Sequence, residues 1–238
     1  MTKLRNRILC SLPIVLLAWT LPPAPAQARF VQQGNKLVGT GAVGGATQGQ
    51  SVAISGDGNT ALVGGPGDNG SFGAAWVFTL SGGVWNQQGP KLIGSGSASQ
   101  PQHGFSVALS GDGNTALVGA PSDNSGAGAA WVFTRSGGVW SQQAKLVGTG
   151  GISPLVYQGA SVSLSGDGNT AIVGAPSDDN FIGAAWVYTR SGETWSQQAK
   201  LVGTGAIGLA EQGASVSLSS HGNIAIVGGP DDNGGGSL

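Results

Sequence analysis

The chain has a single cysteine among its 238 residues, Cys10, and it lies in a segment that we expect to be removed. A mature chain without cysteine holds no disulfide, so packing and strand pairing must supply its stability. Charged residues are also scarce, at 9% of the chain, and the net charge is −1. Because nucleic-acid binding needs a basic surface, this composition argues against a nucleic-acid partner.

The sequence also lacks a long apolar run after its first thirty residues. The N-terminus has a basic start, an apolar stretch over residues 8–21 and a small-x-small sequence that ends at Ala28. This pattern is typical of a secretory signal, and we predict cleavage between Ala28 and Arg29. The stretch is shorter than the roughly 20 residues that span a bilayer. We therefore predict an exported protein, extracellular, on the cell surface or periplasmic, with no transmembrane segment in the mature chain.

Glycine and repetition are what the sequence has in abundance. Glycine occurs 45 times, and two sets of tryptophans each recur every 55 residues. The first set comprises Trp76, Trp131 and Trp186, and the second comprises Trp85, Trp140 and Trp195. A fixed period of this size indicates a repeat architecture.

One repeat contains four short segments with strand-like alternation, at residues 51–55, 60–64, 73–79 and 84–88. The last is expected to continue over residues 91–93. Glycine-rich turns separate the segments, and no helix start or stop signals are present in the mature chain. Four short antiparallel strands per repeat predict a propeller blade, and thus an all-β fold.

The repeats divide the chain into three complete blades and one partial blade. An N-terminal segment resembles the fourth strand of a repeat, and the last repeat stops after its second strand. Such an array leaves strand edges open, so we expect either a shortened member of a longer family or a homo-oligomer that completes itself by self-association. The predicted boundaries are signal peptide 1–28, strand-four-like segment 29–47, blades 48–102, 103–157 and 158–211, and partial blade 212–238.

The motifs within each repeat resemble those of the FG-GAP repeat family. In the second repeat they are Gly104–Ser110, the turn Gly111–Asn114, Gly119–Pro121 and Gly128–Phe133. FG-GAP repeats form the blades of the integrin α-chain propeller and of many secreted bacterial propeller proteins. The resemblance implies a propeller that binds or adheres to a protein or glycan partner through its rim loops.

Several members of that family carry calcium loops with three aspartates, whereas each hairpin turn here offers one carboxylate or none. Because calcium takes 6–8 oxygen ligands, we favour turn chemistry for Asp57, Asp112 and Asp167 and predict no cofactor. The loops after Gly-Ala-Pro are more acidic. The calcium alternative is therefore kept for the paired aspartates there, which are Asp178, Asp179, Asp231 and Asp232.

The fourth-strand tryptophans, Trp85, Trp140 and Trp195, have two interpretations. They fill gaps between strands and blades, or their rings stack on sugars. We favour packing and keep an oligomeric sugar-binding lectin as an alternative function. The first set of tryptophans is predicted to be core.

Catalysis has little support in the sequence. His103 and His221 replace other residues at repeat positions and are interpreted as drift within turns. No nucleophile or metal-ligand spacing is present. We therefore predict an exported, non-catalytic module, with a truncated secreted hydrolase-type propeller as a further alternative.

Overall fold

The computed structural model describes residues 31–232. The predicted signal peptide and its cleavage site at Ala28 and Arg29 lie outside the described residues. Residues 34–232 belong to one compact unit. No helix within residues 31–232 is long and apolar enough to cross a bilayer.

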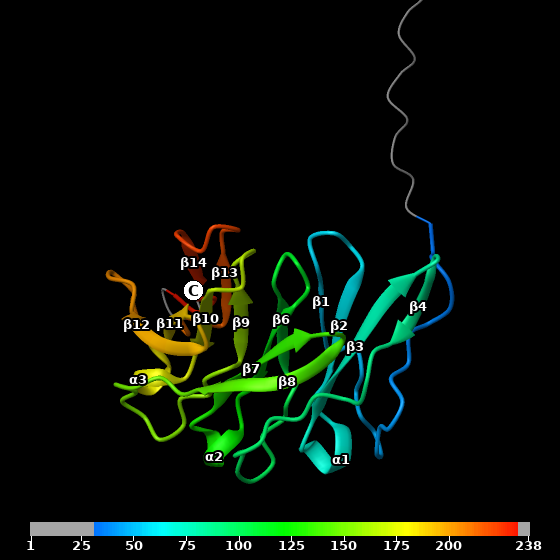
Figure 1. Cartoon of the computed structure of the whole chain (residues 1–238). Coiled ribbons are helices and arrows are strands. Elements are labelled where there is room, and N and C mark those ends of the chain that lie inside the picture. The colour runs from blue at the N-terminus through cyan, green and yellow to red at the C-terminus, as the bar shows by residue number, and fades with distance from the viewer. Residues whose placement is uncertain (1–30, 233–238) are drawn as a thin grey trace, which may run out of the picture. The chain divides into compact units, whose positions relative to one another are not determined.

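Three four-stranded antiparallel sheets and one two-stranded sheet follow one another along the chain (Figure 1). The first sheet contains β1 (Ser51–Ile54), β2 (Thr60–Gly65), β3 (Ala74–Ser81) and β4 (Val84–Gln87). The second contains β5 (Ser106–Leu109), β6 (Thr115–Ala120), β7 (Ala129–Ser136) and β8 (Val139–Leu146). The third contains β9 (Ser161–Leu164), β10 (Thr170–Ala175), β11 (Ala184–Ser191) and β12 (Thr194–Leu201), and the last contains β13 (Ser215–Leu218) and β14 (Ala225–Gly228). The predicted all-β array of three complete blades and one partial blade is confirmed.

The third strand of each complete blade forms the core. Trp186 on β11 is fully buried and lies opposite Val173 on β10 in the sheet register. Trp76 and Trp131 are equally buried in their blades. Large rings supply much of the apolar area in such a core, and the prediction for this set of tryptophans is confirmed.

The first strands of successive blades are joined at their hairpin turns. The Gly56 N–H donates to the Gly111 carbonyl at 2.8 Å, and the Gly111 N–H donates to the Gly166 carbonyl at 2.8 Å. A Cβ at Gly111 would lie 3.0 Å from the Gly166 oxygen. Glycine at this turn position therefore permits neighbouring blades to approach closely.

The fourth strand of the first blade is shorter than predicted. β4 ends at Gln87, and Leu92 pairs with Ala75 only as an isolated bridge. Gly89 has φ 73° and Pro90 has no N–H, so this pair interrupts the ladder. Residues 31–47, which resemble a fourth strand in sequence, form no strand in the structure.

Three helical turns of four residues each were not predicted. They are α1 (Asp68–Ser71), α2 (Asp123–Gly126) and α3 (Asp178–Phe181). Each contains three residues with positive φ, which in α2 are Asn124 at 49°, Ser125 at 57° and Gly126 at 96°. They are therefore compact turns within the predicted polar loops, and none of the three has a side-chain capping hydrogen bond at its N-terminus.

Candidate functional site

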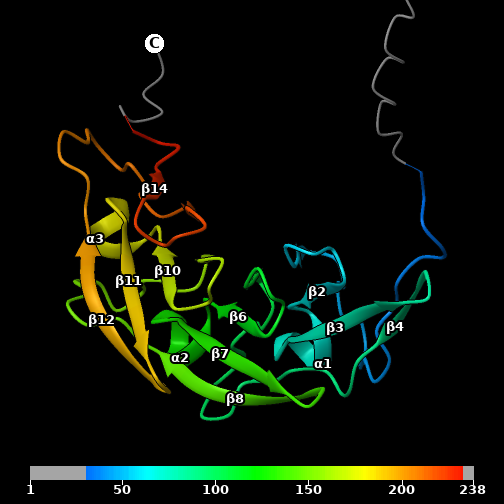
Figure 2. The ribbon, with the colours of Figure 1, turned by 45° about the horizontal axis from the view of Figure 1, so that its top comes forward.

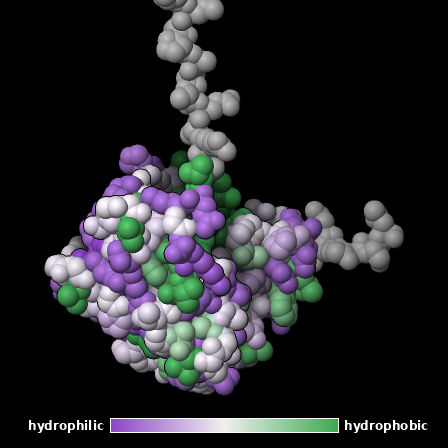
Figure 3. Space-filling model, turned by 90° about the vertical axis from the view of Figure 1, so that its right-hand side faces the viewer, coloured by the Kyte–Doolittle hydropathy of each residue, from purple (hydrophilic) through white to green (hydrophobic). Residues whose placement is uncertain are grey.

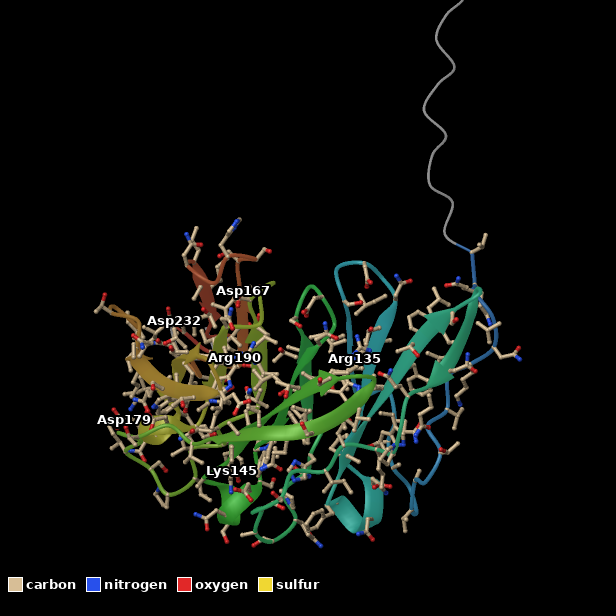
Figure 4. The ribbon with its side chains drawn as sticks, viewed as in Figure 1. Arg135, Lys145, Asp167, Asp179, Arg190 and Asp232 are labelled. Carbon is tan, nitrogen blue, oxygen red and sulfur yellow. The ribbon has the colours of Figure 1, made fainter. Side chains whose placement is uncertain are left out.

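The helical turns and the connections between blades together form one surface, which we call the linker rim. It comprises α1, α2 and α3 with the connections 40–48, 95–103, 149–158 and 204–212. α1 and α2 lie at the bottom of Figure 1, and the hairpin turns of the first and second strands lie at the opposite end. Figure 4 shows this separation through Asp179 of α3 and Asp167 of a hairpin turn.

A buried aspartate anchors each helical turn to the linker rim. The Asp123 carboxylate is 1% exposed. Its Oδ1 accepts from the Ala98 N–H at 2.7 Å, and its Oδ2 lies 2.6 Å from Lys145 Nζ. A buried carboxylate needs such partners, so these contacts fix the connection from the preceding blade against the turn. Asp68 and Asp178 make equivalent contacts in their blades, with Val43 and Lys91 and with Ile152 and Lys200 respectively.

The candidate cation ligands therefore differ in their surroundings. Asp178 is engaged by Lys200 and by the Ile152 N–H, so a cation at this carboxylate would have to displace the lysine. Asp179 is half-buried and Asp231 is exposed. Asp232 accepts from the Ile207 N–H at 2.8 Å. Within residues 31–232 no three metal-ligating side chains gather into one group, and calcium binding stays a prediction.

At the opposite end, the aspartates of the hairpin turns are used within their own turns. Asp57 Oδ1 accepts from Ser55 Oγ at 2.5 Å and from the Asn59 N–H at 2.9 Å. Hydrogen bonds from Ser55 and then Asn59 lower the pKa of Asp57 below its usual value, because they stabilise the carboxylate. Asp112 and Asp167 make the same contacts. The predicted turn chemistry is confirmed.

The fourth-strand tryptophans pack between blades. Trp140 is half-buried against a core cluster that contains residues of the first and second blades. Its indole N–H donates to Gln88 Oε1 at 3.1 Å, and the Arg135 guanidinium lies 5.3 Å from its ring centroid. Arg135 also donates to Gln88, which belongs to the preceding blade. Figure 4 shows Arg135 and Arg190 at similar heights on neighbouring blades. The third blade repeats this arrangement with Trp195, Gln143 and Arg190.

Trp85 of the first blade has a different neighbourhood. Leu80 holds the position that arginine holds in the next two blades. Trp85 lines a hollow of about 300 Å³ together with residues 34–37 and 83–84. Figure 3 shows this side of the molecule, where hydrophobic and hydrophilic side chains are interspersed. All three tryptophans pack against buried core residues, and sugar stacking stays a prediction, with Trp85 beside a larger hollow than Trp140.

The structure buries His103 instead of exposing it in a turn, and its interpretation as drift from the repeat stays a prediction. His103 is fully buried, and its ring centroid lies 4.4 Å from that of Trp131. At the equivalent position Gln158 accepts from the Gly148 N–H and donates to the Gly148 carbonyl, at 2.6 and 3.0 Å. Burial lowers the pKa of His103 to about 4. The sequence shows that histidine stands at a repeat position where the other repeats have glutamine. The burial of its side chain could not be inferred from that difference.

The linker rim also carries exposed apolar side chains that sequence reasoning missed. The backbone of several of them is held by hydrogen bonds to other parts of the rim, as when the Glu211 N–H donates to the Phe181 carbonyl at 2.8 Å. Leu155 and Phe181 are each 46% exposed. The full set is Val43, Ile152, Leu155, Phe181, Ile207 and Leu209. The sequence did contain a signal for them, because these apolar residues lie outside the strand pattern.

Comparison with known families supports the repeat structure. The family model described as FG-GAP repeat matches residues 85–133 and 140–188. These matches cover two adjacent repeats with the same internal order of strands. A search of curated proteins found no significant match.

Proposed function

Because this chain is an FG-GAP repeat protein with propeller-type blades, we propose that it is an exported, non-catalytic module that contacts a protein partner through its linker rim. Export is proposed from the N-terminal sequence, with its basic start, apolar stretch and small-x-small site. Binding is proposed from the rim itself, because a repeat family does not fix a function.

The observation that carries the proposal is the exposure of apolar side chains on a firmly held backbone. Ile152 is 66% exposed, although its N–H donates to the buried Asp178 carboxylate at 2.8 Å. Ile207 is 63% exposed, and its N–H donates to Asp232. Exposed apolar side chains on one rim offer a partner apolar area to bury, which is the main driving force of protein association. Loops that are already ordered lose little conformational freedom on binding.

In each helical turn of the rim the first, buried position is constant and the positions after it vary. The anchoring aspartate recurs in α1, α2 and α3, whereas the positions that follow it read Asn-Gly-Ser, Asn-Ser-Gly and Asp-Asn-Phe. A rigid scaffold with variable outer positions is the arrangement by which many proteins carry binding loops. This favours recognition by the rim over recognition by the strand faces.

A binding screen with matched variants tests the proposal. Mature chain, residues 29–238, is probed against a panel of cell-surface proteins and a glycan array. We expect a protein ligand whose affinity falls at least about tenfold in the double variant Leu155→Ser, Phe181→Ser. Val139→Ser is the control, since Val139 is 70% exposed on the outer strand β8. Binding that persists in the rim variant contradicts the proposal. Binding to glycans alone, lost in Trp85→Ala, would favour the lectin.

A further inference from the structure

Each of the first three blade junctions contains a socket filled by a tryptophan of the following blade. Trp186 lies so close to Gly148 that a Cβ there would overlap its indole ring. Its indole N–H donates to the Thr149 carbonyl at 2.8 Å, and its backbone is paired with Val173. A socket is thus defined by a glycine, the carbonyl of the next residue and a second-strand valine. Trp76 and Trp131 fill the sockets at Gly39–Thr40 and Gly94–Ser95.

The fourth junction has the same parts around a cavity. Gly203, Thr204 and Val227 hold the three defining positions, and all three line a cavity of about 500 Å³. A Cβ at Gly203 would meet Gln212 Oε1 at 2.9 Å and no indole ring. Among the described residues, the fourth sheet consists of β13 and β14 alone (Figure 2). Within residues 31–232, β14 therefore has no partner at the edge that a third strand takes in the other sheets.

The open socket already has the framework of the filled ones. The Gly203 N–H donates to Gln212 Oε1 at 2.5 Å, as the Gly148 N–H donates to Gln158. The Ile207 N–H donates to Asp232, as the Ile152 N–H donates to Asp178. A site formed before its occupant arrives has little ordering cost at binding.

We propose that this edge of β14 is a docking site for a tryptophan-bearing β-hairpin of the same repeat type. The hairpin adds a third strand to β14, and its indole enters the socket beside Gly203 and donates to the Thr204 carbonyl. Backbone pairing at a sheet edge gives affinity, and the socket gives specificity for tryptophan. This proposal does not rest on the linker rim and stands independently of what the rim binds.

The internal repeats also identify what the fourth strand of that hairpin contributes. In the third junction, Gln197 Oε1 accepts from the Thr149 N–H at 2.8 Å. Gln142 accepts from the Ser95 N–H in the junction before. Thr204 makes no hydrogen bond of this kind within residues 31–232. A hairpin with the sequence of residues 183–201 carries both the tryptophan and this glutamine.

A synthetic peptide of residues 183–201 is the probe for this site. It is labelled with fluorescein and titrated with the mature chain, and binding is followed by fluorescence anisotropy. We expect saturable binding with one peptide per chain. The peptide with Trp186→Ala should bind more than about tenfold more weakly, because the anchor in the socket is lost.

A chain variant tests the socket from the other side. Gly203→Ala places a methyl group where the indole would lie, and Gly203 has no left-handed φ that would strain alanine. We expect this variant to keep the thermal midpoint of the parent chain and to bind the peptide more than about tenfold more weakly. Absence of peptide binding to the parent chain overturns the proposal. Equal binding of the Trp186→Ala peptide, or equal binding by a folded Gly203→Ala chain, also overturns it.

Discussion

The second strands of the third and fourth blades have nearly the same sequence and opposite environments. Ile172 on β10 is fully buried, while Ile226, at the same repeat position on β14, is 69% exposed. β10 lies between β9 and β11, whereas β14 pairs with β13 alone within the described chain. Burial in this array is thus set by the neighbouring strand, because identical residues become core or surface according to what lies beside them.

The two junctions are nevertheless alike in their connections. Gly148 and Gly203 each bond to a glutamine side chain of the following repeat, and Ile152 and Ile207 each donate to an aspartate. These contacts join one connection to the first half of the next blade. They therefore form without the third and fourth strands. The tryptophan contacts of the filled sockets, in contrast, need the third strand.

The largest effect is expected when a filled socket loses its occupant. Trp186→Ala removes a fully buried ring from the third blade and should lower the free energy of unfolding by about 3–5 kcal/mol. The measurement is urea denaturation followed by circular dichroism. Trp85→Ala is the matched control, because Trp85 is only half-buried. Equal losses in the two variants would contradict the assignment of the buried set as the core.

A pH experiment compares the junction that contains His103 with those that contain glutamine. The pKa of His103 is lowered to about 4 in the fold, so the unfolded chain binds more protons between that pH and about 6.5. The contribution of His103 to the free energy of unfolding is therefore fully present above pH 6.5. It falls by up to about 3 kcal/mol as the pH drops to about 4.

His103→Gln restores the side chain found at Gln48, Gln158 and Gln212. This variant should be at least as stable as the parent at neutral pH and should lose the dependence between pH 4 and 6.5. The measurement is the urea midpoint at several pH values. A parent chain whose stability is constant across that range would contradict the burial of a neutral His103.

The glycines of the two sockets give a third comparison. Gly148→Ala should cost about 1–3 kcal/mol, because the added methyl group overlaps a buried indole that cannot move freely. Gly203→Ala should change stability by less than about 0.5 kcal/mol, since its nearest neighbour is the end of the flexible Gln212 side chain. Thermal unfolding of both variants is the test. A reversed order would show that the fourth socket is filled.

The smallest effect concerns the arginine contacts between blades. Arg190→Leu copies Leu80 of the first blade and removes the hydrogen bond to Gln143 and the contact with Trp195. We expect a loss of about 1 kcal/mol because the guanidinium is partly exposed. A double-mutant cycle with Gln143→Ala measures the coupling. Additive effects of the two substitutions would mean that the contact contributes nothing.

Repetition made most of the fold predictable. The 55-residue period and the alternation within it indicated the strands, the blades and the core position of Trp76 and its equivalents. The end of the fourth strand at Gln87 was harder to predict. It depends on one residue that the first repeat has in addition to the other repeats, next to Pro90. The site was less predictable. Asp123 and Lys145 are 22 residues apart in the sequence, and only the folded blade brings them within 2.6 Å of each other. The burial of His103 likewise follows from the ring of Trp131, which another strand supplies.

Hydrogen–deuterium exchange with and without the hairpin peptide of residues 183–201 tests the central claim most directly. The claim is that the fourth socket is already formed and open. Alone, the chain should show slow exchange over residues 203–212 and fast exchange over residues 222–230, which include β14. Saturating peptide should slow exchange over residues 222–230. Exchange over residues 222–230 that does not change with the peptide would contradict the claim.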